Sequence, residues 1–160
     1  MAIYMKMGKI EGNVTAQGYE KLMECESVTL STDREITLSV GAGKEREVSK
    51  PAFQEIMVTK EADKATPYLF QEAFTGKAVD EVEIRFAKTS NDAIETYMTY
   101  VLKDALISSY QISSGSDGDP YESVSIAFTK FEMKYHPRES DNQLGSAIPV
   151  GYDLKLGKKS

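Results

Sequence analysis

Apolar residues alternate with polar ones along most of this chain, which is the period of half-buried β-strands. Clusters of turn-forming residues separate the alternating segments. The segments predicted as strands are residues 3–7, 22–31, 35–40, 53–59, 79–86, 94–112, 121–135 and 150–156. Seven or more such strands predict a mainly β fold, either a closed or nearly closed antiparallel β-barrel of two packed sheets or a β-sandwich.

One segment has the period of an α-helix instead. Thr66 followed by Pro67 is a typical helix start, because the residue before a proline avoids the helical conformation and suits an N-cap. Gly76 follows the last apolar residue, where a left-handed glycine often ends a helix. These signals predict a single flanking helix near residues 66–75.

The apolar residues of this helix form one stripe. Leu69, Phe70 and Phe74 recur at helical spacing, with polar residues on the other side. A helix of about ten residues is too short to be stable alone in water. We therefore expect Leu69, Phe70 and Phe74 to pack against the sheet and hold the helix there.

The segment from Gly41 to Pro51 fits neither period. Polar connections of this length are unusual in compact domains and often have a function. Mixed charge suits contact with another copy of the chain, because each sign can meet its opposite; a plain surface loop is the alternative. The candidate contact residues are Gly41, Gly43, Lys44, Glu45, Arg46, Glu47 and Lys50.

Length and charge narrow the class of protein. The 160 residues fit one domain over 1–160, with a polar C-terminal tail from about residue 137. The net charge of −6 argues against nucleic-acid binding, which needs a basic surface. No apolar run approaches the ~18 residues of a membrane-spanning helix, and no signal peptide is recognisable. These features predict folding in a reducing cytosol, and they are compatible with export that uses no signal peptide.

Three possible chemical sites fail on spacing. Gly41–Lys44 resembles a phosphate-binding loop but lacks its first glycine and its hydroxyl residue. Asp117–Asp119 resembles the start of a calcium loop, without the later glycine and glutamate, and fits a hairpin loop better. His136 and Cys25 are the only residues of their types and lack metal-ligand spacing, and one cysteine forms no internal disulfide. No catalytic, cofactor or metal site is predicted.

Blocks of sequence spread along nearly the whole chain resemble one known family. They are Ile3–Lys6 with Gly8, Ile10 and Gly12; Ile56–Lys60; Asp63–Leu69; Thr75–Lys77; Ser108–Tyr110 with Ser113–Gly115; Glu122–Ser125; Phe128–Tyr135; and Gly151–Lys155. In their order they resemble the haemolysin-coregulated protein (Hcp) family of bacterial type VI secretion. One departure is that Val28 and Met133 stand where the family often has tryptophan.

The resemblance implies a function as well as a fold. It implies a structural protomer and not an enzyme: a β-barrel with one helix that closes into a hexameric ring, and rings that stack into a hollow, propelled tube. The implied partners are further copies of the chain, the sheath and spike-tip proteins, and small effector proteins in the lumen. It implies no nucleic-acid partner and no membrane insertion. The protein would be made in the bacterial cytoplasm and then secreted, with the loop at about 41–51 reaching a neighbouring ring.

Other classes of protein stay open at this point. A phage tail-tube protein would share the fold and the ring-and-stack assembly. A monomeric ligand-binding β-barrel would hold an apolar molecule in its interior. An enzyme using surface carboxylates is a third alternative, for which no suitably spaced pair stands out.

Overall fold

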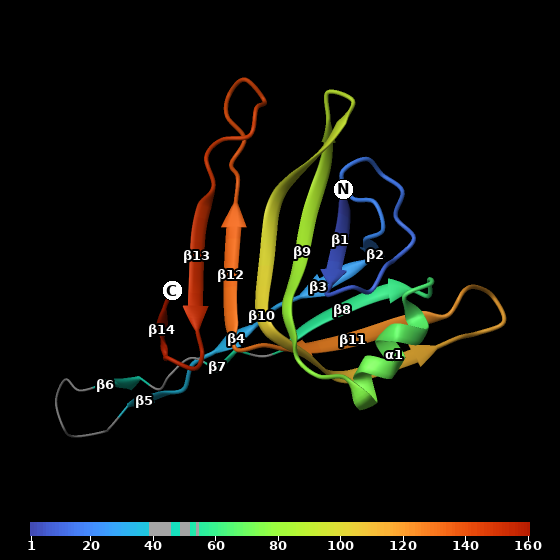
Figure 1. Ribbon diagram of the computed structural model, residues 1–160. Helices are drawn as coiled ribbons and strands as arrows, with labels where there is room; N and C mark the ends of the chain where they lie inside the picture. The colour runs from blue at the N-terminus through green and yellow to red at the C-terminus, as the bar shows by residue number, and fades with distance from the viewer. Residues whose placement is uncertain (39–45, 49–51, 54) are drawn as a thin grey trace.

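The computed structural model describes residues 1–38, 46–48, 52–53 and 55–160. One helix and a set of antiparallel strands make up this part of the chain (Figure 1). No helix in these ranges is long and apolar enough to span a membrane. The elements are β1 (Ala2–Met7), β2 (Met23–Cys25), β3 (Ser27–Thr29), β4 (Thr32–Asp33), β5 (Ile36–Leu38), β6 (Arg46–Val48), β7 (Ala52–Phe53), β8 (Ile56–Glu61), α1 (Thr66–Thr75), β9 (Val79–Ser90), β10 (Ala93–Ser113), β11 (Tyr121–Ala127), β12 (Lys130–Tyr135), β13 (Ile148–Asp153) and β14 (Lys158–Lys159).

The long strand β10 organises the sheet. Its first half pairs with β9 on one side and with β12 on the other, and its second half pairs with β11. The segment 121–135, predicted as one strand, is divided into β11 and β12 by a gap of two residues, Phe128 and Thr129, and the two strands follow one another along β10. The sheet extends from β9 to β1, from β11 to β8, and from β12 to β13.

The ends of this curved sheet meet at residues 23–29. There β2 pairs with β1, whereas β3 pairs with β8. Between them the Glu26 amide donates a hydrogen bond of 2.8 Å to the carbonyl oxygen of Thr59. The predicted antiparallel β fold with one helix is confirmed. Within the described residues, however, no continuous ladder closes the barrel, since the chain itself passes from one edge to the other.

The core lies between the two halves of the sheet and beneath α1. Methionine is prominent in it, with Met5, Met7 and Met23 all buried. Methionine fills irregular space well because its side chain is unbranched and flexible. Val28 and Met133, the residues at the family's tryptophan positions, pack against this core as half-buried side chains.

The helix has the predicted bounds but not the predicted end geometry. Ala65 is the N-cap, and Thr66 is already helical; its Oγ1 accepts a hydrogen bond of 3.0 Å from the Asp63 amide. Gly76 is extended, with φ −69° and ψ 149°, and not left-handed. Glycine is needed there because an added Cβ would lie 2.4 Å from the carbonyl oxygen of Glu72. The close approach of the Glu72 carbonyl oxygen therefore requires glycine at position 76, and the backbone angles of Gly76 do not.

Candidate assembly surfaces

His136 and Cys25, the two candidate reactive side chains, both lie in the described part of the chain. Among the described residues, histidine, cysteine, aspartate and glutamate side chains form no group of three that could hold a metal ion. His136 is engaged within its own loop, with Nδ1 3.1 Å from the carbonyl oxygen of Gly145. Burial raises the pKa of the Cys25 thiol to about 12. Because the thiolate is the reactive form, this cysteine is poorly nucleophilic.

A buried charged network fixes the start of α1 to the sheet. Lys60 of β8 and Glu122 of β11 lie opposite each other in the ladder, with Nζ 2.5 Å from Oε2 and both side chains fully buried. Lys60 Nζ also donates hydrogen bonds of 2.9 Å to Asp63 Oδ1 and to the carbonyl oxygen of Glu61. The Tyr110 hydroxyl of β10 donates to the other oxygen of Glu122. Three strands and the turn before the helix are thereby connected.

Asp63 links this network to the helix. Its Oδ1 accepts a hydrogen bond of 2.9 Å from the Ala65 amide at the N-cap. One carboxylate oxygen therefore serves both the buried Lys60 ammonium and the helix start. This cluster was not among the predicted sites, although the sequence contains a signal for it. Lys60 and Glu122 continue the buried alternation of their strands at positions where the pattern calls for apolar residues.

The helix residues predicted to pack are divided by the structure. Leu69 is fully buried, as expected, and Ala73 packs on the core one turn further along. Phe70 and Phe74 are 53% and 65% exposed, so the prediction that the whole stripe is buried is wrong. The reason is geometric: these two residues lie about 100° further round the helix than Leu69 and Ala73. The Phe70 ring contacts the rings of Phe74 and Tyr110, at centroid distances of 5.1 and 5.7 Å.

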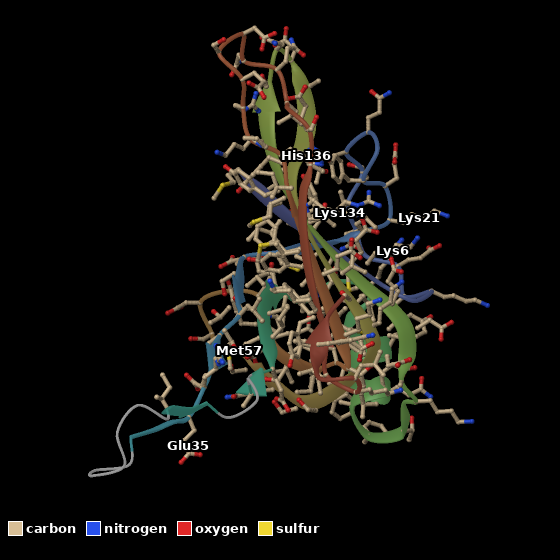
Figure 2. The ribbon with its side chains drawn as sticks, turned by 90° about the vertical axis from the view of Figure 1, so that its left-hand side faces the viewer. Lys6, Lys21, Glu35, Met57, Lys134 and His136 are labelled. Carbon is tan, nitrogen blue, oxygen red and sulfur yellow. The ribbon has the colours of Figure 1, made fainter. Side chains whose placement is uncertain are left out.

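A two-stranded arm projects from the body between β3 and β8. Its base is the pairing of β4 with β7, and further out β5 pairs with β6 (Figure 1). Figure 2 shows Glu35 part-way along the arm and Met57 near the point where the arm joins the body. Of the predicted contact residues, Arg46 and Glu47 are described only as backbone of β6, opposite Leu38 and Thr37. Those outside the described residues are Gly41, Gly43, Lys44, Glu45 and Lys50.

Comparison with known proteins decides the class. A family model described as "Type VI secretion system effector, Hcp" matches residues 4–135, which is most of the chain. The chain belongs to the Hcp family. No curated protein sequence matches it significantly.

Solved structures of Hcp proteins share its fold. The structure of a type six secretion system protein is 25% identical, covers 99% of both chains and has a TM-score of 0.91. Hcp1 from Salmonella typhimurium is 21% identical, with a TM-score of 0.78 over 99% of this chain and 98% of its own. The secreted protein Hcp3 from Pseudomonas aeruginosa is 20% identical, with a TM-score of 0.61 over 95% and 97%. At 21% and 20% identity, the similarity to Hcp1 and Hcp3 establishes the fold alone.

Membership of the Hcp family settles the broad role. Hcp is the tube protein of the type VI secretion system, a structural protein and not an enzyme, and it is secreted. Hcp proteins associate with copies of themselves into rings. The functional parts of this Hcp chain are therefore surfaces that meet other proteins.

Proposed function

We propose that this chain is a tube protomer that closes into a hexameric ring, and that its rings stack into a hollow tube. The observation that carries the proposal is the Hcp family match over residues 4–135. The fold supports it, because it follows a type six secretion system protein over 99% of the chain. A ring of identical subunits needs two different surfaces on each protomer that fit one another.

The proposed tube carries small effector proteins in its lumen, lies inside a sheath and ends at a spike tip. It leaves the cell by a route that reads no signal peptide. A conduit of this kind needs no reaction centre, which agrees with the buried, protonated thiol of Cys25 and the loop-bound ring of His136. The export step is tested by comparing secretion from cells with and without a contractile sheath. Secretion that persists without the sheath contradicts it.

The assembly step is tested by measuring mass in dilute solution by light scattering. A hexameric ring has about six times the 17.8 kDa mass of one chain. A protein that stays monomeric at all concentrations contradicts the proposal. A monomer that also retains a tightly bound small molecule supports a ligand-binding barrel instead.

We further propose that the arm from β4 to β7 mediates stacking between rings more than closure of one ring. Its described part projects from the body as a narrow two-stranded ribbon, which suits reaching a neighbour (Figure 1). The sequence of the segment 41–51 combines both signs of charge, in Lys44, Glu45, Arg46, Glu47 and Lys50. Each exposed ion pair contributes only ~0–1 kcal/mol, so several must act together. Stacking is therefore expected to weaken as salt rises.

The test replaces Lys44, Arg46 and Lys50 with glutamate and measures ring mass and stack length separately. We expect intact rings and short stacks. Rings that dissociate would assign the arm to ring closure, and long stacks that persist would leave it a surface loop. A control variant changes the net charge equally on the body, at Lys6, Lys9 and Lys21, and is expected to keep its stacks. Figure 2 shows Lys6 and Lys21 on the side of the body away from the arm.

A further inference from the structure

Part of the sheet carries apolar side chains that the described residues leave about half exposed. Tyr135 of β12 pairs with Ile148 of β13, and Met133 pairs with Val150 two positions further along, on the same side of the sheet. Their side chains lie on the same side of the sheet as the buried ring of Phe131. The core reaches Met133 and ends before Tyr135, Ile148 and Val150.

This surface is called the β13 face, and it consists of Tyr135, Ile148 and Val150, which are 43%, 57% and 57% exposed. Its backbone edge is closed to strand addition. Pro149 has no amide hydrogen to donate, and the Ser160 amide already donates to the carbonyl oxygen of Gly151 at 3.2 Å. A partner must therefore dock on the side chains of this face and not on its edge.

A second apolar surface lies at the other end of the molecule. It is called the α1 face, and it consists of Phe70, Phe74 and Ile112, which are 53%, 65% and 44% exposed. The half-buried Tyr110 supports it from below by its contact with the Phe70 ring. Two aromatic rings of one helix are thus exposed beside the end of β10.

The two faces lie on opposite sides of the protomer. In Figure 1, β13 is at the left and α1 is at the right. In Figure 2, viewed from that left-hand side, the strands β12 and β13 are in front and the helix is behind. Two different apolar surfaces on opposite sides of one chain are what head-to-tail association requires.

The charges beside the faces are also opposite. Exposed Lys158 and Lys159 form β14, which pairs with β13. Exposed Asp117 and Asp119 lie in the loop that follows the end of β10, beyond Ile112. A copy that brings its α1 face onto the β13 face of its neighbour places acidic groups near basic ones. This complementarity favours a second copy of the chain as the occupant.

We propose that the ring closes by docking of the α1 face of one protomer onto the β13 face of the next. This inference rests on the proposed function and adds the pair of surfaces that form the contact. Exposed aromatic side chains are typical anchors of such contacts, because they bury a large apolar area with little loss of rotamer freedom.

The first test places a carboxylate on each face. Val150→Glu alters the β13 face, and Phe74→Glu alters the α1 face. An unpaired carboxylate is costly to bury against apolar groups, so each variant should raise the concentration for half-maximal ring formation at least about 100-fold. Ile94→Glu, at the tip of the β9–β10 hairpin and 36% exposed, is the matched control and should form normal rings. Circular dichroism and thermal unfolding of each variant verify the fold.

Mixing the two variants shows which face meets which. Each variant alone has one intact face and should stay monomeric. In an equimolar mixture, the intact β13 face of the Phe74→Glu protein can bind the intact α1 face of the Val150→Glu protein. The mixture should form dimers and nothing larger. Dimers of either variant alone would mean that a face binds its own kind, and would overturn the proposal.

A charge exchange tests the same contact with variants at exposed positions only. Asp117→Lys with Asp119→Lys should weaken ring formation about 3- to 10-fold at low salt. Adding Lys158→Asp and Lys159→Asp should restore it. A fourfold variant no better than the twofold one would overturn the paired arrangement.

The remaining outcomes separate this inference from the proposed function. A wild-type protein that never forms rings overturns both. Wild-type rings together with normal rings of Val150→Glu and Phe74→Glu overturn this inference alone. Loss of effector export or sheath binding in those ring-forming variants would assign the faces to another partner.

Discussion

Substitution of Lys60 by methionine removes the cation from a site with no access to water. Glu122 would then keep its carboxylate fully buried, with the hydrogen bond from the Tyr110 hydroxyl as its remaining side-chain contact. Asp63 would lose a hydrogen bond of 2.9 Å but keep the one from the Ala65 amide. The free-energy change is therefore dominated by one uncompensated buried charge.

Loss of one partner from a buried ion pair costs about 3–5 kcal/mol of unfolding free energy. The Lys60→Met/Glu122→Leu double variant removes both charges and fills the space with apolar groups. It should be destabilised by less than about 1–2 kcal/mol, because such replacements are often neutral. The summed destabilisations of the single variants Lys60→Met and Glu122→Leu should therefore exceed that of the double variant by at least about 3 kcal/mol.

The assay is urea unfolding followed by circular dichroism, with all variants at one protein concentration because ring formation adds to apparent stability. With a urea slope of about 2 kcal/mol/M, Lys60→Met should lower the midpoint by about 1.5–2.5 M. A loss below about 1 kcal/mol for Lys60→Met would refute the reasoning. So would additive effects of the two single changes, since they would mean that each charge finds another partner or water.

Three further predictions concern single residues. Leu69→Ala should cost about 2–5 kcal/mol in the same assay, and the half-exposed Phe70→Ala only about 1–2 kcal/mol, when both are measured at a protein concentration too low for ring formation. Under that condition, a larger loss at Phe70 would contradict its exposure in the protomer. Gly76→Ala should destabilise by about 1–3 kcal/mol, because the new Cβ meets the Glu72 carbonyl oxygen at 2.4 Å, and an unchanged midpoint would show that the turn adjusts freely. Cys25→Ser should leave ring formation intact, and the wild-type thiol should resist a thiol reagent at pH 8 until the protein unfolds. Burial raises the pKa of the Cys25 thiol from 9.0 to about 12, so the protonated thiol favours the folded state fully below about pH 9, and this contribution to the unfolding free energy is lost as pH rises toward 12. A Cys25 thiol that reacts at once at pH 8 would contradict its burial.

Local signals in the sequence were sufficient for most of the elements. Strict alternation identifies the strands because successive side chains of a strand point to opposite faces. The turn at Asn91 and Asp92 follows from residues that tolerate positive φ, which the structure gives as 48° and 64°. The helix at 66–75 follows from its apolar spacing, its proline and its glycine. The order of the sequence blocks identified the Hcp family before any contact was known.

Contacts between distant residues could not be derived in this way. Lys60 and Glu122 are 62 positions apart, and only the register of β8 against β11 sets them opposite each other. Gly76 is a glycine because Glu72 approaches it closely, although the sequence suggested a left-handed turn. The alternation likewise did not show that residues 23–29 pair first with β1 and then with β8, so that no continuous hydrogen-bonded ladder joins these two edges of the sheet.

Burial is the property that the sequence predicted least well. The pattern assigns Leu69, Phe70 and Phe74 to one stripe and Val150 to one face of a strand, but it does not show how far an opposing layer extends. The core covers Leu69 and ends before Phe74 and Val150. Periodicity determines the direction in which a side chain points relative to its own backbone. Whether anything lies in that direction depends on the packing of elements distant in the chain, and in this protein also on the next protomer that we propose to dock there.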